Sequence, residues 1–310
     1  MKIFVCIPLT EMQQQSLVHS LRGDTIFFVP ENAPGPEARA AFNASEVVFG
    51  NPPADWLLEG IQPRWIQLES VGFGEYINAG LATGPNLPMM SNLSGFFSEP
   101  VAESMLAGIL GFLRGLGPLQ ELQRRSGWMG DDLRPRLRVL KGLSVVMIGR
   151  GAINKRLAEL LAPFDCRITS FGSDLELSEL DEALRNADIV ACCVPHTERT
   201  KNLFGANRLA LLKADALFLN FGRGSLVDEN ALADALIAHR LGGAVIDVTR
   251  EEPIPNGHPF WTTPRLMLTQ HTAGGSVDEL ERKIEFFLDN LARYRQGKAL
   301  LSPIDFRRGY

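Results

Sequence analysis

The sequence has no excess of basic residues. Its 310 residues include 31 lysines and arginines against 36 aspartates and glutamates, which gives a formal net charge of −5. Proteins that bind nucleic acid usually carry a basic surplus or a basic stripe, so this balance argues against that class. No apolar run approaches the roughly 18 residues of a transmembrane helix, so no membrane span is expected. The apolar start, Met1 to Pro8, is too short for a signal-peptide core with its cleavage site, and we expect a strand there.

Cysteine and histidine are also scarce. The four cysteines show no CxxC spacing, and three of them fall in apolar, strand-like runs. We therefore expect buried, reduced thiols, no metal site and a cytoplasmic location, because a reducing compartment keeps thiols in this form. The sequence shows neither internal repeats nor low-complexity segments. The histidines available for histidine-dependent chemistry are His19, His196, His239, His258 and His271.

What the sequence does contain is the composition of an ordinary globular protein, with 45% apolar and 22% charged residues. At about 150 residues per domain, the length suggests two domains. Short apolar runs alternate with polar helical stretches, and this β/α alternation predicts α/β domains in which parallel sheets carry helices on both faces. Buried strands are expected at residues 2–8, 25–29, 46–49, 65–68, 143–148, 166–171, 188–194, 216–220, 243–248 and 266–269.

Several helices have start signals or a clear apolar period in the sequence. Thr10 with Gln13, and Ser276 with Glu279, have the spacing of capping boxes, and Asp228 is placed as an N-cap. The longest of the early helical patterns is long enough to connect two domains. The helices expected from these signals cover residues 10–22, 99–125, 228–240 and 276–296.

A glycine-rich turn follows the expected strand over residues 143–148. Gly149 would allow the tight turn, and Gly151 would let the backbone approach a pyrophosphate that the N–H groups of the next turn face. Strand, glycine turn and helix is the context in which this dinucleotide fingerprint has meaning. Asn154 replaces its third glycine, and we expect this side chain to push the helix slightly outward. The other turn residues predicted to contact the cofactor are Arg150, Ala152 and Ile153.

The acidic residue that reads the cofactor ribose should come about 20 residues later, at the end of the second strand. Gly172 stands at that position. The missing carboxylate removes the repulsion that excludes a 2′-phosphate, yet no arginine or lysine lies in the next several residues to bind one. Asp174 could instead reach a ribose hydroxyl or stay solvated in a loop. The choice between NAD and NADP is therefore open.

Three residues with catalytic potential follow three later strands. Arg223 comes after the strand over 216–220 and offers a planar fork for a carboxylate and its neighbouring carbonyl. His271 follows the strand over 266–269 and can exchange a proton with a substrate oxygen near neutral pH. Glu252 follows the strand between them, and its carboxylate would fix the tautomer of His271 by bonding the other ring nitrogen. Each residue alone has a structural alternative, but their order on successive strand ends predicts a 2-oxo acid reductase.

With these residues, the sequence resembles the D-isomer-specific 2-hydroxyacid dehydrogenases, glyoxylate and hydroxypyruvate reductases in particular. The resemblance covers nearly the whole chain and is strongest from Leu143 to Ser276. In the first half, Ser70-Val71-Gly72-Phe73 resembles the substrate loop of the family. Gln270 replaces the proline that usually precedes the histidine, and we expect only local backbone effects. The other matching segments are Phe221-Gly222-Arg223-Gly224 with Val227-Asp228-Glu229, Glu252-Pro253, Thr269-Gln270-His271, Pro195-His196-Thr197 with Thr200, and His258-Pro259-Phe260-Trp261.

The resemblance implies reversible hydride transfer between NADH or NADPH and C2 of a small 2-oxo acid such as glyoxylate or hydroxypyruvate, with a D-2-hydroxy acid as product. Protonated His271 would donate to the carbonyl oxygen, Glu252 would stabilise the imidazolium, and Arg223 would hold the carboxylate. Substrate would also be bound by N–H groups at Val71, Gly72 and Phe73. The cofactor contacts implied outside the glycine turn are Gly172, Ser173, Val194, Pro195, His196, Thr200, Phe221, Gly222, Asp247 (to the nicotinamide amide) and Gly274.

The resemblance also implies the architecture, which is two doubly wound parallel-sheet domains. A flavodoxin-like substrate domain would comprise residues 1–96 and 278–310, and a Rossmann cofactor domain would comprise residues 97–277. Members of this family are usually homodimers through the cofactor domain. The apolar residues that such an interface would use, unless they pack in the core, are Phe112, Leu113 and Leu116.

Two interpretations from other classes stay open. One is a nucleotide-sensing corepressor on the same fold, since a related corepressor keeps the same residue types, and turnover of glyoxylate or hydroxypyruvate would separate the two. The other is formate or phosphite oxidation on the same scaffold. A formate-type site would place glutamine, not Glu252, beside the histidine, whereas phosphite oxidation needs a direct assay. An L-specific enzyme is disfavoured by the order of Arg223, Glu252 and His271.

Overall fold

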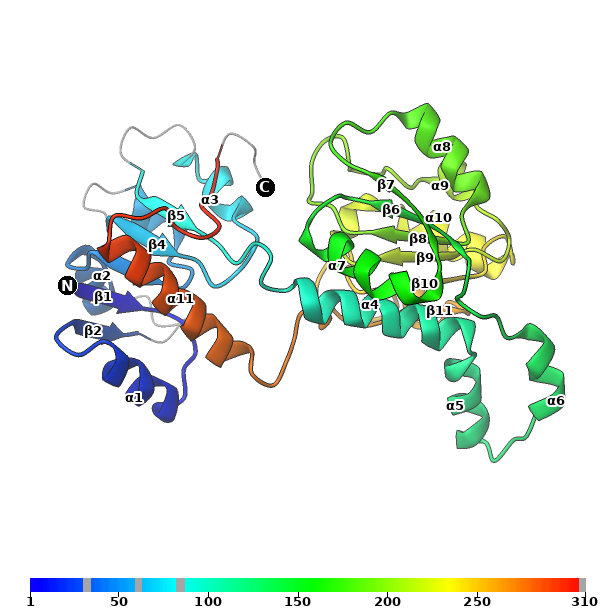
Figure 1. Ribbon diagram of the computed structural model, residues 1–310, viewed down its shortest axis with the longest axis horizontal. Helices are drawn as coiled ribbons and strands as arrows, with labels where there is room; N and C mark the ends of the chain where they lie inside the picture. Colours follow the sequence, from blue (N-terminus) through cyan, green and yellow to red (C-terminus); the bar gives the residue numbers. More distant parts are fainter. Residues whose placement is uncertain (30–34, 59–62, 82–86, 307–310) are drawn as a thin grey trace. The chain divides into compact units, whose positions relative to one another are not determined.

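The chain forms two compact units (Figure 1). Unit 1 comprises Met1–Phe96 together with Ser276–Tyr310, and unit 2 is the continuous stretch Phe97–Gly275. Unit 2 therefore interrupts unit 1 in the sequence. Among the described helices, none combines the length and the hydropathy needed to span a bilayer. The structure, a computed structural model, describes residues 1–29, 35–58, 63–81 and 87–306.

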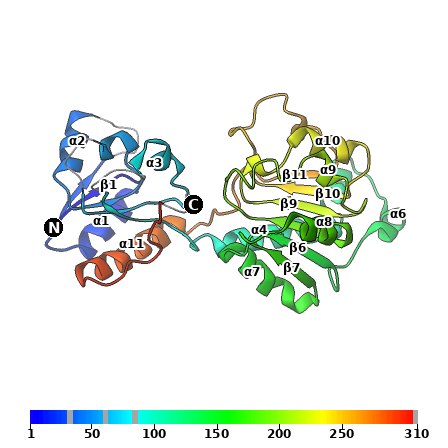
Figure 2. The same ribbon diagram turned by 90° about the horizontal axis from the view of Figure 1, so that it is seen from above.

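The described residues of unit 1 form a five-stranded parallel sheet with the order β2-β1-β3-β4-β5, which is the flavodoxin-like order. Helices α1 and α11 cover one face and α2 and α3 the other (Figure 2). Ile3 and Val5 face α1 and α11 while Phe4 faces the other side, as the two-residue period of a strand requires. The elements are β1 Lys2–Val5, α1 Glu11–Ser20, β2 Thr25–Phe28, α2 Pro36–Asn43, β3 Val47–Phe49, η1 Ala54–Leu57, β4 Trp65–Gln67, α3 Gly74–Asn78, β5 Met89–Ser91 and α11 Glu279–Arg295.

The C-terminal helix α11 supplies part of the core of unit 1. Phe287 stacks on Phe49 of β3 with ring centroids 4.3 Å apart, and it lies 5.7 Å from the ring of Trp65 in β4. Asn290 is fully buried and donates from Nδ2 to Oε1 of Gln67 at 2.8 Å. Because α11 contributes both apolar contacts and a buried hydrogen bond, the core on this face of the unit 1 sheet is complete only when this helix is present.

The capping box predicted for the last helix is wrong. The helix begins at Glu279, with Asp278 as its N-cap and no side-chain cap hydrogen bond. The hydroxyl of Ser276 hydrogen-bonds the Asp278 carboxyl and lowers its pKa, so it does not reach the helix amides. The box of Thr10 and Gln13 at the start of α1 is confirmed, because both of its reciprocal hydrogen bonds are present.

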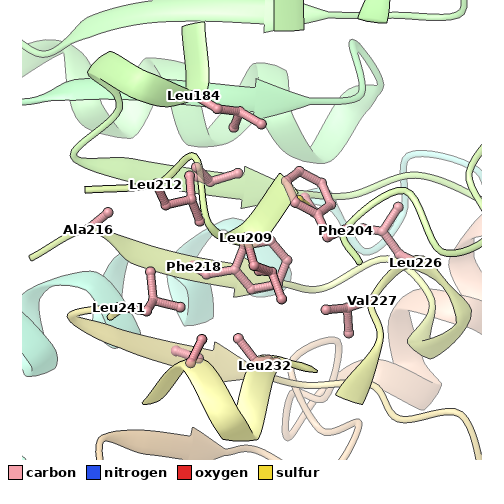
Figure 3. Packing of buried hydrophobic residues seen from close by; sticks show 14 of the residues in the cluster. Leu184, Phe204, Leu209, Leu212, Ala216, Phe218, Leu226, Val227, Leu232 and Leu241 are labelled. Atoms are coloured by element: carbon pink, nitrogen blue, oxygen red, sulfur yellow. The ribbon is translucent and has the colours of Figure 1, made fainter. Parts of the chain in front are cut away.

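Unit 2 has a six-stranded parallel sheet with the order β11-β10-β9-β8-β6-β7. Helices α4 and α7 pack on one face, and α8, α9 and α10 pack on the other (Figure 2). Phe204 and Phe218, with centroids 5.0 Å apart, lie within the leucine-rich cluster of the second face (Figure 3). The elements are α4 Ser98–Leu113, α5 Leu116–Arg124, α6 Gly130–Leu133, η3 Arg134–Arg136, β6 Ser144–Ile148, α7 Ala152–Leu161, η4 Ala162–Phe164, β7 Arg167–Phe171, α8 Leu177–Asn186, β8 Ile189–Cys192, α9 Ala206–Leu209, β9 Leu217–Asn220, η5 Gly224–Leu226, α10 Glu229–Ile237, β10 Gly243–Ile246, η6 Pro259–Trp261 and β11 Leu266–Leu268.

Strand β7 is an edge of this sheet. A dinucleotide-binding sheet of order 3-2-1-4-5-6 carries a further strand outside its second strand. In unit 2, whose residues 97–275 are all described, the chain passes instead from β7 through α8 directly to β8 on the far side of β6. Arg167, Ile168 and Thr169 of β7 are exposed as a result.

The long helix predicted over residues 99–125 is two helices. Helix α4 ends at Leu113, and α5 begins after Gly115, which has a left-handed φ of +66° that favours glycine. A Cβ on Gly115 would lie 2.9 Å from the side chain of Leu137, so this turn also has little space for a larger residue. Helix α4 is buried along the sheet, whereas α5 has no buried residue and projects away from the sheet of unit 2 with α6 (Figure 1).

Candidate active site

Arg223, Glu252 and His271 follow the adjacent strands β9, β10 and β11 of unit 2. These strands are parallel, so their carboxyl ends meet at one edge of the sheet. Ligands bind at that edge in open α/β sheets. The fold of unit 2 thus brings the three sequence positions to the part of the sheet where a bound substrate is expected.

His271 and Glu252 form a hydrogen-bonded pair. Nδ1 of His271 lies 2.6 Å from Oε2 of Glu252, and the other carboxylate oxygen accepts from the N–H of Thr249 at 2.8 Å. Because Nδ1 faces the carboxylate, the proton on that nitrogen is held there, and Nε2 is the atom that can face a substrate. The His271 side chain is 55% exposed, so a substrate oxygen can reach it.

The turn that carries His271 is held by Asp247. The N–H of His271 donates to the carbonyl oxygen of Asp247 at 2.6 Å. The buried Asp247 carboxylate accepts from the hydroxyl of Thr269 at 2.6 Å and from the N–H of Thr272 at 3.1 Å. Gln270 has a left-handed φ of +55°. Proline, with φ fixed at about −65°, cannot adopt this conformation. The replacement of the usual proline by Gln270 therefore goes with a different backbone conformation at this position of the turn.

Arg223 lies between two glycines that closely approach other strand ends. A Cβ on Gly222 would lie 2.6 Å from the carbonyl oxygen of Val194, and one on Gly224 would lie 2.0 Å from the carbonyl carbon of Thr249. Glycine is therefore the residue that fits at both positions. The backbone on either side of Arg223 packs against the loops after β8 and β10. Its side chain is exposed, with Nη1 donating to the carbonyl of Gly222 at 2.7 Å.

Asn220 is a supporting residue that the sequence reasoning did not single out. It is fully buried at the end of β9. Its side chain donates to the carbonyl oxygen of Arg223 at 3.0 Å and accepts from the N–H of Gly222 at 3.2 Å. These two hydrogen bonds fix the backbone from which the Arg223 side chain leaves the sheet.

Glu229 is a second supporting residue, buried in the first turn of α10 after the N-cap Asp228. Its carboxylate accepts from the N–H of Arg250 at 2.9 Å and lies 3.2 Å from Nε2 of His258. Glu229 therefore anchors the loop that carries Glu252. In the sequence, Glu229 could be seen only as an acidic residue next to the helix cap. Its partners, Arg250 and His258, lie more than 20 residues further along the chain, so its role could not be read from its neighbours.

A half-buried thiol lies near these residues. Cys193 follows β8, and its sulfur contacts the carbonyl oxygen of Phe221 at 3.6 Å. Burial raises the pKa of the Cys193 thiol to about 12, although the nearby Arg223 acts in the opposite direction. The thiol is therefore protonated at neutral pH and is not a nucleophile. Within the described parts of the chain, no three His, Cys, Asp or Glu side chains are grouped so as to hold a metal ion.

The glycine turn lies between β6 and α7. Gly149 has a φ of +108°, and a Cβ there would lie 2.4 Å from the carbonyl oxygen of Cys193. Gly151 is the N-cap of α7, no side chain caps the helix, and a Cβ at Gly151 would meet nothing within 4 Å. The first N–H groups of α7 thus lack a side-chain acceptor beside open space, which fits the pyrophosphate of a dinucleotide.

Asn154 stands at the third glycine position of the turn and is buried in the first turn of α7. Its buried side chain donates from Nδ2 to the carbonyl oxygens of Ile148 at 3.0 Å and Gly149 at 2.8 Å. These bonds tie the first turn of α7 to the end of β6. Where a third glycine would permit close helix–strand packing, this chain thus has a side chain that hydrogen-bonds the end of the strand.

The glycine turn meets the loops after β8 and β9. A Cβ on Gly149 would lie 3.2 Å from the side chain of Val194, and the backbone of Val194 also packs against Gly222. Phe221, next to Gly222, is buried in the core. These predicted cofactor contacts, from three different strand ends, therefore lie together in unit 2.

The other predicted cofactor residues of unit 2 also follow strand ends. Nδ1 of His196 lies 2.6 Å from the hydroxyl of Ser225, which links the loops after β8 and β9. Thr200 donates from Oγ1 to the carbonyl oxygen of Pro195 at 2.8 Å and closes the same loop. A Cβ on Gly274 would lie 3.0 Å from the ring of Phe97, the residue before α4.

The predicted substrate loop follows β4 in unit 1. The hydroxyl of Ser70 donates to the carbonyl oxygen of Gly72 at 2.8 Å, and Nδ2 of Asn92 donates to that of Val71 at 2.8 Å. The side chain of Phe73 is buried in the core of unit 1, whereas Val71 and Gly72 are exposed. The loop is thus anchored by Phe73 and by two side chains, with its backbone at the surface of unit 1.

Comparison with known proteins identifies a family. The model of the D-isomer specific 2-hydroxyacid dehydrogenase NAD binding domain matches residues 106–273, more than half of the chain. A glyoxylate reductase of Aeropyrum pernix is 29% identical over 266 residues, 79% of this chain and 77% of that protein. The mitochondrial formate dehydrogenase of Solanum tuberosum is 30% identical over 244 residues, 74% of this chain and 64% of that protein. The D-isomer specific 2-hydroxyacid dehydrogenase of Xanthobacter autotrophicus Py2, solved with NADPH and MES, shares the fold with a TM-score of 0.79 at 22% identity over 99% of each chain.

Proposed function

The chain belongs to the D-isomer specific 2-hydroxyacid dehydrogenase family, and from this premise we propose that it reduces the C2 carbonyl of a small 2-oxo acid, such as glyoxylate or hydroxypyruvate, to the D-2-hydroxy acid. The observation that carries the proposal is the 2.6 Å contact between His271 and Glu252 at the sheet edge that Arg223 shares. This reaction needs a proton donor, a carboxylate that stabilises the charged donor and a cation for the substrate carboxylate. His271, Glu252 and Arg223, in that order, have the side chains for these roles.

The residues of unit 2 supply orientation and charge for this reaction. A bound nicotinamide cofactor supplies the hydride, and the uncapped first turn of α7 would hold its pyrophosphate. Protonated His271 gives the proton on Nε2 to the carbonyl oxygen and becomes neutral, and Glu252 stabilises the imidazolium before the transfer through its contact with Nδ1. The guanidinium of Arg223 binds the substrate carboxylate and polarises the neighbouring carbonyl. Asp247 positions His271 through the turn, and we assign it the nicotinamide amide as a second partner.

Unit 1 is assigned the remaining substrate contact. The exposed backbone at Val71 and Gly72, next to the anchored Phe73, would donate N–H groups to the second carboxylate oxygen. Asn92 and Ser70 support this assignment, since their side chains occupy the carbonyl groups of the loop and fix its backbone. Unit 1 would thus be the substrate domain, and unit 2 the cofactor domain.

Glu252 also bears on the two alternative functions. A formate-type site would place glutamine beside the histidine, whereas the partner of His271 is Glu252. This favours 2-oxo acid reduction, although a formate dehydrogenase is among the relatives. A nucleotide-sensing corepressor on this fold could keep the same three side chains, so turnover is the property that separates it from an enzyme.

A substrate panel tests the proposal. We expect the purified protein to oxidise NADH or NADPH in the presence of glyoxylate or hydroxypyruvate, and chiral analysis to give the D-isomer of glycerate from hydroxypyruvate. Formate and phosphite are assayed in parallel with the oxidised cofactors. Dinucleotide binding without turnover of any 2-oxo acid would support a sensing protein instead. Cofactor reduction by formate or phosphite, without 2-oxo acid turnover, would support the other dehydrogenase class.

We also propose a cytoplasmic location. None of the four cysteines, all of which are described, is part of a disulfide. Cys6 and Cys192 are buried, and the other two are half-buried. Reducing compartments keep cysteines in this state, which supports the proposal.

We further propose that the protein is a homodimer through unit 2. Of the three residues expected at such an interface, Leu113 is buried and Phe112 packs against the core of unit 2, so Leu116 is the exposed one. Helix α5 has no buried residue, and Leu119 and Trp128 are exposed together with Leu116. A second copy of the chain would cover these exposed apolar side chains, Leu116, Leu119 and Trp128.

Charges on α5 should break this dimer. Light scattering coupled to size exclusion is expected to give the wild type twice the chain mass of 34.1 kDa, and the double variant Leu116→Glu, Leu119→Glu the mass of a single chain. The matched control is Met12→Glu, which places the same charge on an exposed apolar residue of α1 and should leave the mass unchanged. A wild type that elutes as a monomer at micromolar concentration would refute the proposal.

A further inference from the structure

The guanidinium of Arg150 lies over the end of β7. Nε and Nη2 donate to the carbonyl oxygen of Ser170 at 3.2 and 3.0 Å, and Nη1 lies 2.9 and 2.8 Å from the two carboxylate oxygens of Asp174. A Cβ on Gly172 would lie 3.1 Å from Cδ of Arg150 and 3.4 Å from its Nη1. Arg150 therefore lies against the position at which a NAD-specific sheet carries its acidic ribose reader.

A second arginine contacts the same loop. Arg199, from the segment after β8, donates from Nη1 to the carbonyl oxygen of Ser173 at 2.7 Å and from Nη2 to that of Leu175 at 3.1 Å. The loop over residues 172–175 is thus bound by two guanidinium groups. Neither arginine lies directly after β7, because Arg150 precedes that strand and Arg199 follows β8.

Asp174 is the counterion of Arg150. The Arg150 and Asp174 side chains are 53% and 68% exposed. The hydrogen bond from Arg150 lowers the pKa of the Asp174 carboxyl, so the carboxylate is charged at neutral pH. Exposed ion pairs of this kind are weak, and a phosphate carries more charge and more acceptor oxygens than a carboxylate. A phosphate on a bound cofactor can therefore replace Asp174 at the guanidinium, whereas a neutral ribose hydroxyl competes less well.

We propose that the chain prefers NADP(H) to NAD(H), and that Arg150 binds the 2′-phosphate while Arg199 holds the loop beside it. The specificity residue is then an arginine inside the glycine turn rather than a residue that follows the second strand. This inference rests on the dinucleotide binding that the proposed function requires, but it does not depend on which acid is the substrate.

Direct binding tests this assignment without turnover. Isothermal titration of the full chain with NADP⁺ and with NAD⁺ is expected to show at least about tenfold tighter binding of NADP⁺, as a charge-assisted contact between the guanidinium and the phosphate should provide. Arg150→Ala should remove most of this preference and leave NAD⁺ binding within about threefold of the wild type, because the pyrophosphate site is unchanged. Asp174→Asn should strengthen NADP⁺ binding, since it removes the competing carboxylate. Added salt should weaken NADP⁺ binding more than NAD⁺ binding in the wild type and equally in Arg150→Ala.

The matched control is Arg167→Ala. Arg167 is an exposed arginine at the opposite end of β7, where it contacts Ser144, so its loss should change neither affinity. Equal or tighter binding of NAD⁺ by the wild type would overturn the proposal, as would an equal loss of both cofactors in Arg150→Ala. Turnover that uses NADH alone would refute the cofactor assignment and keep the proposed reaction. A retained NADP⁺ preference without turnover of any 2-oxo acid would keep the cofactor assignment and refute the proposed reaction.

Discussion

Replacing His271 by alanine is expected to lower kcat/KM for 2-oxo acid reduction by about 10²- to 10⁴-fold, the usual contribution of a positioned proton donor. The side chain is 55% exposed, and its turn is held by backbone contacts to Asp247. The variant should therefore fold normally, with an unfolding temperature close to that of the wild type. Steady-state kinetics and thermal unfolding on the same preparations measure both expectations.

Two further variants show whether the loss belongs to the proposed proton transfer. Glu252→Gln keeps a side chain of the same size beside His271 but removes the charge, so it should reduce kcat less than the loss of the imidazole and shift the pH profile of kcat/KM. His19→Ala removes an exposed histidine of α1 and should have wild-type activity. Wild-type activity in His271→Ala would end the assignment of this residue as the acid.

The second large effect is expected at Arg223. Its replacement by alanine removes the cation that binds the substrate carboxylate and polarises the carbonyl, and the expected loss in kcat/KM is about 10²- to 10³-fold, as for other preorganised electrostatic groups. Arg223→Lys should recover only part of the loss, because a single ammonium cannot form the fork that a guanidinium forms. The side chain is exposed and Asn220 holds only its backbone, so stability should not change.

Substrate kinetics at Arg223 separate a binding role from a structural one. Both the rise in KM and the fall in kcat should be large for 2-oxo acids, while the affinity for the dinucleotide measured by titration stays the same. Arg240→Ala, an exposed arginine just after α10, is the matched control with no expected effect. A loss of dinucleotide binding equal to the loss of activity would show that Arg223 instead supports the fold of the cofactor site.

The central strands of this chain could be placed from the sequence because their side chains are buried on both faces. The apolar runs were longer than the strands, however. Ile7 and Val248 are buried, although β1 ends at Val5 and β10 ends at Ile246. Core residues thus continue into the loops at the strand ends, where burial no longer indicates hydrogen-bonded strand. Strand β5, Met89–Ser91, was not predicted, because its residues include none of the β-branched or aromatic types that mark a strand in a sequence.

Helix boundaries depended on which contact each capping side chain makes. Thr10 and Gln13 bind each other's backbone, so a local pattern was sufficient. Ser276 has the same spacing from Glu279, but its hydroxyl binds Asp278 instead. The break at Gly115 depends on a left-handed backbone and on the nearby Leu137, and a helical period does not reveal either.

Candidate site residues that directly follow their own strand could be named from the sequence, as for Arg223 and His271. The residues that bind the loops around them could not be named from the sequence, because they come from distant segments of the chain. Glu229 binds the loop after the next strand, and Arg150 binds the end of β7. The sequence left the cofactor choice open for the same reason, since the cation that contacts the reader position precedes β7 in the chain.

The interruption of unit 1 by unit 2 has a consequence for protein synthesis. Unit 2 is one continuous stretch, so it can complete its core while the ribosome still holds the C-terminal segment. Unit 1 begins earlier but lacks Phe287 and Asn290 until α11 has been translated. Until then, the sheet face that contains Ile3 and Phe49 has no α11 to cover it. The unit whose synthesis begins first is therefore the unit that finishes folding last, and its partly uncovered sheet face is the surface that a chaperone on the nascent chain would meet.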